Sequence, residues 1–174
     1  LREDEVSIYA LEVLERLNET IDAVEAAYCE YQFNTVAQRI YDFVWGDFCD
    51  WFVEAAKTDI FGEDETRKQS TLATMDFVLS AVVRLLHPFM PHLTEELWSL
   101  MGFASGEHDF LDFASISDSI CWAKSRCTTA RTRVDAIYQT VEAGRNLRAE
   151  ARVPSSQKAK FILSSNETWA KEEI

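Results

Sequence analysis

The chain has 174 residues, of which 47% are hydrophobic, and its 17 basic and 30 acidic side chains give a formal net charge of −13. This length can bury the core of one domain, and the acidity excludes a protein that coats itself with nucleic acid through a broad basic surface. Only five Gly and three Pro interrupt the chain, so we expect an all-α fold built from a few long helices.

The first helix is predicted at about residues 4–31. Apolar residues recur there in steps of three and four, from Val6 and Tyr9 to Tyr28 and Tyr31. This spacing places them on one face of a helix.

A second helix is expected from Asn34 to about Lys57, with its apolar residues on one broad arc. Asp47 and Glu54 lie seven residues apart at the edge of that arc, where charge is poorly solvated. A catalytic pair is conceivable there. No neighbouring pattern suggests a reaction, however, and we expect an interhelical hydrogen bond or salt bridge.

Residues 58–68 are expected to connect to a third helix, whose inner face is predicted to hold Leu72, Met75, Leu79, Val82 and Leu86. Pro88 and Pro91 are expected to end this helix. A short fourth helix should open at residues 94–96 and close at Gly102.

Residues 103–122 are expected to form an irregular loop before a fifth helix at about 125–151. Residues 158–163 alternate like a β-strand. The sequence therefore predicts a bundle of about five helices at residues 1–153. A short, truncated α/β appendage is predicted to start at residues 154–174.

The charge is unevenly distributed, with a net of −17 over residues 1–123, +4 over 124–152 and zero over the remainder. Any contact with phosphate groups must therefore be local. The four Cys residues show no zinc-type spacing, so we interpret them as reduced structural thiols of a cytosolic protein. No apolar run of about 20 residues and no basic leader are present, which predicts a soluble, non-exported chain.

No catalytic or metal-binding motif is recognisable in the sequence. A di-metal carboxylate site needs Glu-x-x-His pairs, and none of His87, His92 and His108 completes one. His87 and His92 flank the Pro-rich turn, where we expect capping or packing roles. A Gly-rich phosphate loop, a zinc-protease motif and a nucleophile set are all lacking.

Two stretches resemble class I aminoacyl-tRNA synthetases. Residues 85–98, Leu-Leu-His-Pro-Phe-Met-Pro-His-Leu-Thr-Glu-Glu-Leu-Trp, resemble a signature shared by the valyl, isoleucyl and leucyl enzymes. Residues 41–54 contain Phe-Cys-Asp-Trp followed by an aromatic residue and, two residues later, Glu, which is similar to the valyl type. Residues 16–20 and 145–154 are similar to the same type. Ala10-Leu11-Glu12 departs from it.

This resemblance implies an all-helical anticodon-binding domain that performs no chemistry. The ATP-binding signatures His-Ile-Gly-His and Lys-Met-Ser-Lys-Ser do not occur in the sequence. The resemblance therefore implies that ATP, with Mg²⁺, acts in a catalytic domain of the same polypeptide, that this chain needs no cofactor, and that its partners are that domain and tRNA(Val). Neither membrane nor DNA is an expected partner, and the expected location is the cytoplasm.

Antiparallel packing of successive helices predicts that one end of the bundle gathers the residues that contact tRNA. Single-stranded RNA loops are bound by aromatic and guanidinium planes, with Lys and Arg on the phosphates. The candidates are Lys57, Phe61, Arg67, Lys68, Phe103, Phe110, Lys124 and Arg126.

Three alternatives stay open at the level of sequence. The domain could come from an isoleucyl or leucyl enzyme, or be a protein-interaction bundle that does not bind RNA. Arg131, Arg133, Arg145 and Arg148 could line either the tRNA stem or the interface with the catalytic part.

Overall fold

The computed structural model describes residues 6–104, 111, 124–154 and 157–164, with the backbone alone described at 124–129. The elements are α1 (Ile8–Cys29), α2 (Phe33–Asp42), the π-helical segment η2 (Phe43–Phe52), α3 (Val53–Ile60), α4 (Glu65–Leu86), α5 (Pro91–Leu100) and α6 (Lys124–Glu150). No strand occurs among the described residues, so the predicted all-α fold is confirmed and the strand predicted at 158–163 is wrong.

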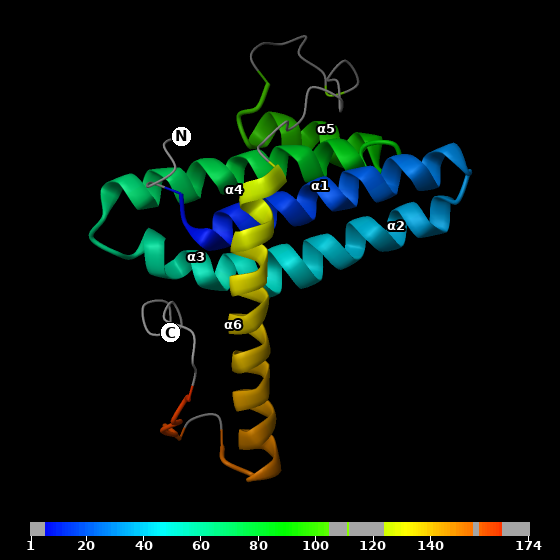
Figure 1. Ribbon diagram of the computed structural model, residues 1–174. Coiled ribbons are helices and arrows are strands. Elements are labelled where there is room, and N and C mark those ends of the chain that lie inside the picture. The colour runs from blue at the N-terminus through cyan, green and yellow to red at the C-terminus, as the bar shows by residue number, and fades with distance from the viewer. Residues whose placement is uncertain (1–5, 105–110, 112–123, 155–156, 165–174) are drawn as a thin grey trace. The chain divides into compact units, whose positions relative to one another are not determined.

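The chain divides into two compact units, Leu1–Arg131 and Thr132–Ile174. In the first unit, α1 packs against α2, η2 and α4, while α5 packs against α4. Figure 1 shows the antiparallel course of these helices, with the α1–α2 turn at one end of the bundle and the α3–α4 turn at the other. Since α1 has 22 residues, the two ends lie about 33 Å apart.

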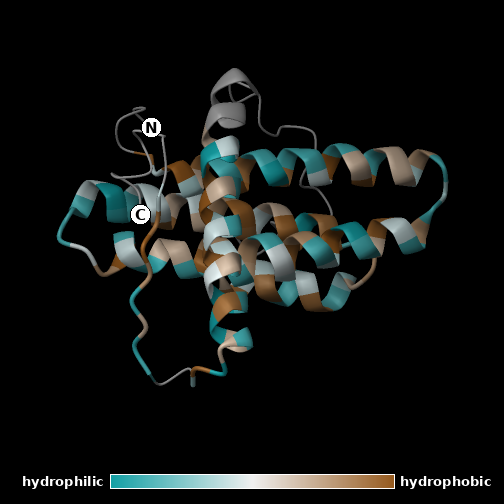
Figure 2. Ribbon diagram, turned by 60° about the horizontal axis from the view of Figure 1, so that its bottom comes forward, coloured by the Kyte–Doolittle hydropathy of each residue, from teal (hydrophilic) through white to brown (hydrophobic). Residues whose placement is uncertain are grey.

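The main core of the first unit is a cluster of apolar side chains from α1, α2, η2, α3 and α4. Hydrophobic and hydrophilic residues alternate along these helices, as Figure 2 shows. Residues buried completely include Val13, Leu17, Val36, Phe52 and Val78. The inner face predicted for the first helix is therefore confirmed along most of its length.

The second predicted helix is continuous, but its middle is wound as a π-helix. The buried residues follow one another as Ile40, Phe43, Phe48 and Phe52, and the step of five between Phe43 and Phe48 exceeds an α-helical turn. The backbone N–H of Val53 accordingly donates to the carbonyl of Phe48, five residues earlier. Both phenylalanines thereby reach the core.

The buried face of α4 is displaced from the predicted one. Leu72 is exposed, whereas Thr71 and Thr74 are buried. Thr71 donates a hydrogen bond of 3.1 Å from Oγ1 to Oδ2 of the buried Asp59 on α3. This polar contact replaces the apolar packing that we predicted at the start of the helix.

Two predicted helix boundaries are also wrong. The third helix begins at Glu65, capped by the Asp64 side chain, which accepts hydrogen bonds from the backbone N–H groups of Thr66 and Arg67. Pro91 opens the next helix at its first turn and does not end the preceding one. At that position proline loses no hydrogen bond, because the first N–H groups of a helix have no internal acceptor.

In the second unit, α6 follows its predicted range closely. Gly144 of this helix lies 4.0 Å from the Phe161 ring, measured from the position a Cβ would take. Val134 and Ile137 are buried, whereas Val141 and Leu147 are exposed.

One helix of the described residues, α4, has the length and hydropathy of a membrane span. Its buried face packs inside the bundle, against α1, α3 and α5.

Cys29 and Cys49 are free, in line with the reduced thiols that we predicted, and their exposure gives no support to a structural role. Burial and the neighbouring Asp50 raise the pKa of the Cys49 thiol. Cys121 lies outside the described residues.

Candidate nucleic-acid interface

Four of the residues predicted to contact tRNA lie at the α3–α4 turn. Lys57 is in the last turn of α3, Phe61 follows the end of that helix, and Arg67 and Lys68 are in the first turn of α4. The Phe61 side chain is 82% exposed. The structure therefore brings this part of the predicted set together.

Each cation at this turn is paired with a carboxylate. Lys57 Nζ lies 2.6 Å from Glu54 Oε1. Lys68 Nζ lies 3.6 Å from Glu65 Oε2, and an Arg67 guanidinium nitrogen lies 3.9 Å from Asp59 Oδ1. Residues 54–68, the acidic turn below, contain three basic and five acidic side chains, a net charge of −2. The cationic end that we predicted is therefore not cationic.

Phe103 does not join this group. Its ring packs against Trp98, with a centroid distance of 5.0 Å, in a small apolar cluster that includes Val83. Val83 is 16 residues beyond Arg67 on the same helix, a separation of about 24 Å. The prediction of one shared end is wrong for Phe103, because α5 has ten residues and stops beside the second half of α4.

Phe110 lies outside the described residues. Lys124 and Arg126 lie on the first turn of α6, and their side chains are outside the described part of the structure.

Two arginines of the predicted fifth helix have structural contacts. Arg131 forms an ion pair with Glu19 of α1. Arg148 donates hydrogen bonds of 2.7 and 2.9 Å to the backbone oxygens of Pro154 and Gln157. These bonds hold the segment that follows α6 against the end of that helix. For Arg133 and Arg145, both alternatives stay open: they could line the tRNA stem or the interface with the catalytic part.

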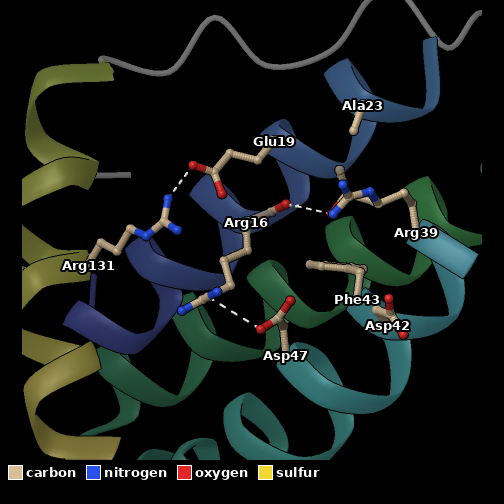
Figure 3. Close-up of a pocket in the computed structure, with 9 residues that line it drawn as sticks. Arg16, Glu19, Ala23, Arg39, Asp42, Phe43, Asp47 and Arg131 are labelled. Atoms are coloured by element: carbon tan, nitrogen blue, oxygen red, sulfur yellow. Dashed lines mark hydrogen bonds and ion pairs between the residues drawn. The ribbon is translucent and has the colours of Figure 1, made fainter. Parts of the chain in front are cut away.

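A polar cleft of about 270 Å³ brings together the two stretches that resemble the valyl type most closely. Arg16, Glu19 and Thr20 line it from α1, and Asp42, Phe43 and Asp47 from the other side. Figure 3 shows Arg16 extending from α1 toward Asp47, and Arg131 meeting Glu19.

The centre of this cleft is an ion-pair chain. Arg16 Nε contacts Glu12 on its own helix and lies 3.4 Å from Asp47 Oδ1 on η2. Glu12 is almost completely buried. Asp47 therefore makes the interhelical salt bridge that we predicted, while Glu54 pairs within its own helix with Lys57. Because Arg16 and Arg131 each form an ion pair with a carboxylate here, the cleft ties helices together.

The opposite end of the bundle carries exposed aromatic side chains. At the end of α1, the N–H of Gln32 donates to Ala27 O and the N–H of Tyr31 donates to Tyr28 O. These two bonds form the Schellman motif, in which the residue just past the helix is usually Gly, because its φ is positive. Tyr31 occupies that position with φ 57° and is 80% exposed. The prediction that Tyr31 faces the core is wrong.

Rings from two turns meet around Tyr31. Phe33 lies 6.4 Å from Tyr31 and 6.1 Å from Tyr28, measured between ring centroids. Phe89, in the α4–α5 turn, stacks on Tyr28 at 6.3 Å. Burial raises the pKa of the Tyr28 hydroxyl, so its ring stays neutral well into alkaline solution.

An apolar groove of about 310 Å³ continues from Phe89 along α2 and η2. Tyr41 and Trp45 line it as a parallel stack, with centroids 6.1 Å apart and an interplanar angle of 1°. Both are 60% exposed. We call Tyr28, Tyr31, Phe33, Phe89, Tyr41 and Trp45 the aromatic surface.

The aromatic surface is less acidic than the opposite end. Residues 25–45 and 84–92, which hold all six rings, together carry three acidic and two basic side chains, a net charge of −1. Arg84 lies over the Trp98 ring at 5.1 Å. The sequence signal that could have located this surface is the pair Tyr31 and Phe33 in a polar turn, which we interpreted as part of a buried helical face.

His87 has a structural contact at the α4–α5 turn. His87 Nδ1 lies 2.8 Å from Thr94 Oγ1, which confirms the capping and packing role predicted for it. Among the described residues, no three His, Cys, Asp or Glu side chains gather in an arrangement that could hold a metal ion.

Comparison with known proteins identifies the family to which the chain is similar. Residues 10–163 match the family described as the anticodon-binding domain of tRNA ligase. The chain is 36% identical over 160 residues to a valine–tRNA ligase of Listeria monocytogenes, an alignment that covers 92% of the chain and 18% of the relative. It is 35% identical to that of Bacillus licheniformis and 33% identical to that of Bacillus subtilis, in each case over 88% of the chain and 17% of the relative.

The chain thus spans less than a fifth of the length of these relatives. The family match covers the bundle, α6 and the segment after it, including both stretches that line the polar cleft. The chain belongs to the family of anticodon-binding domains of tRNA ligases.

Proposed function

We propose that this domain binds the anticodon arm of tRNA(Val) as part of a valine–tRNA ligase. The observation that carries the proposal is the agreement between the family match over residues 10–163 and the relatives named as valine–tRNA ligases at 33 to 36% identity. The helical bundle described above is consistent with such a role.

The domain is proposed to hold tRNA and leave the chemistry to another part of the same polypeptide. That part would use ATP, with Mg²⁺, to attach valine to the tRNA. The ligase would act in the cytoplasm, where translation takes place. No residue of this chain is assigned a catalytic role.

The proposal is tested in two steps. The 174-residue chain should bind tRNA(Val) in a gel-shift titration, and a chain with no affinity for it would refute RNA binding. The full-length protein that contains this domain should exchange pyrophosphate into ATP in the presence of valine. Exchange with isoleucine or leucine in place of valine would show that the domain serves one of those ligases.

Lys124 and Arg126 stay proposed phosphate contacts, because they begin the one stretch of the chain with a net positive charge. Lys68, Lys57 and Arg67 have a weaker case, because each shares its charge with a carboxylate on the acidic turn.

Charge reversal separates these two groups. Arg126→Glu should weaken tRNA binding and lower the slope of log K against log[salt] by about 0.7 to 0.9 for each phosphate that is no longer neutralised. Lys68→Glu should have a smaller effect, since its ammonium is already paired. An equal or larger effect at Lys68 would place the phosphates at the acidic turn.

A further inference from the structure

The aromatic surface is an unusual place to leave large rings in water. Tyr31 is 80% exposed, Tyr41 and Trp45 are 60% exposed, and Phe33 is 52% exposed. Tyr31 and Phe33 lie at one end of the first unit, where contacts of Tyr28 with both Phe33 and Phe89 join the α1–α2 turn to the α4–α5 turn. Tyr41 and Trp45 lie further along α2 and η2, on the apolar groove that continues from Phe89. No packing among the described residues covers these rings.

Tyr31 is held in a backbone conformation that its side chain disfavours. A left-handed φ is unfavourable for a residue with a Cβ, and the same Schellman position at the end of α5 is occupied by Gly102 with φ 75°. A tyrosine that is both strained and exposed contributes little to the fold. Strained backbone conformations cluster at functional sites.

The chemistry of the surface fits bases better than phosphates. No charged side chain lines the groove beside Tyr41 and Trp45, so a phosphate would find no cation there. The stretches that carry the six rings have a net charge of −1 in a chain of net charge −13, so RNA is repelled less there than at the acidic turn, whose net charge is −2. Flat, neutral, exposed rings are the platforms on which unpaired bases stack.

We propose that unpaired bases of an RNA loop stack on the aromatic surface, with Tyr31 and the Tyr41–Trp45 pair as the principal platforms. This inference rests on the proposed function, because the family match supplies the RNA, and it places the bound loop at the end of the bundle opposite to the acidic turn.

The test compares three variants with the wild-type chain against a hairpin that reproduces the anticodon stem and loop of tRNA(Val). Tyr31→Gly and the double variant Tyr41→Ala/Trp45→Ala remove platforms. Phe61→Ala is the matched control, because it removes an equally exposed ring from the acidic turn. Thermal unfolding of each variant shows that the chain is folded.

Loss of one stacked base lowers affinity by roughly 5- to 150-fold. We expect losses in this range for Tyr31→Gly and for the double variant, with the salt slope unchanged because no ion pair is removed. Phe61→Ala should bind within about twofold of the wild type. A 2-aminopurine placed in the loop should be quenched on binding the wild-type chain and less quenched on binding the double variant.

The outcomes separate the inference from the function on which it rests. If the wild-type chain does not bind the hairpin or tRNA(Val), the proposed function fails. If it binds, and the aromatic variants retain wild-type affinity and full quenching, the inference alone is overturned. A loss confined to Phe61→Ala also overturns it and moves the loop to the acidic turn.

Discussion

Tyr31 shows how a single residue can be placed against its own preference. Its N–H and that of Gln32 close the end of α1 by the pattern that usually ends in Gly. Because Tyr31 is 80% exposed, replacing it removes few contacts. Tyr31→Gly should therefore stabilise the chain by about 0.5 to 1 kcal/mol, measured by urea unfolding, as the strain is relieved. Lower stability would mean that the tyrosine ring supports the fold and is not kept for binding.

Gly62 and Gly144 test how closely the backbone is packed at single positions. A Cβ on Gly62 would lie 2.8 Å from the carbonyl oxygen of Thr58, whereas one on Gly144 would meet only the Phe161 ring, at 4.0 Å. Gly62→Ala should therefore destabilise the chain by about 1 to 3 kcal/mol. Gly144→Ala, inside a helix, should be neutral or stabilise by about 0.5 to 1 kcal/mol. Equal melting temperatures for the two variants would contradict this reasoning.

At the scale of elements, Arg16 links α1 to η2 through its ion pairs with Glu12 and Asp47. Arg16→Met should destabilise the chain by about 2 to 3 kcal/mol, because it removes the guanidinium that faces a buried carboxylate. The control is Lys57→Met, which removes one member of an exposed pair and should cost less than about 1 kcal/mol. Similar unfolding midpoints for both variants in urea would show that the cleft is not structural.

The elements also show how far the sequence allows the fold to be predicted. Apolar spacing locates most of α1 and α6, because their buried residues keep to α-helical steps. Apolar spacing does not reveal that η2 is a π-helix. The five-residue step from Phe43 to Phe48 can be mistaken for a small irregularity in an α-helical pattern. Apolar spacing also misplaces the inner face of α4, where Thr71 is buried because of its hydrogen bond to Asp59. That partner lies 12 residues away and is not visible in a helical pattern.

At the scale of the whole molecule, the family could be recognised from sequence but the binding end could not. Most of the residues in the motifs at 16–20 and 41–54 belong to the cleft and the core, and Tyr41 and Trp45 are the exposed exceptions, so the motifs mainly report the fold. A count of cations along the chain placed the tRNA contacts at the α3–α4 turn. The count could not reveal that Lys57, Arg67 and Lys68 each face a carboxylate. The exposure of Tyr31 depends on the Schellman motif, which takes it out of the helix.

Hydrogen–deuterium exchange of the 174-residue chain, with and without tRNA(Val), tests the central claim most directly. If RNA bases cover the aromatic surface, exchange should slow at residues 30–33 and 87–90, the two turns that carry Tyr31 and Phe89, and stay unchanged at residues 61–64. Slower exchange at 61–64 with no change at the two aromatic turns would contradict the account.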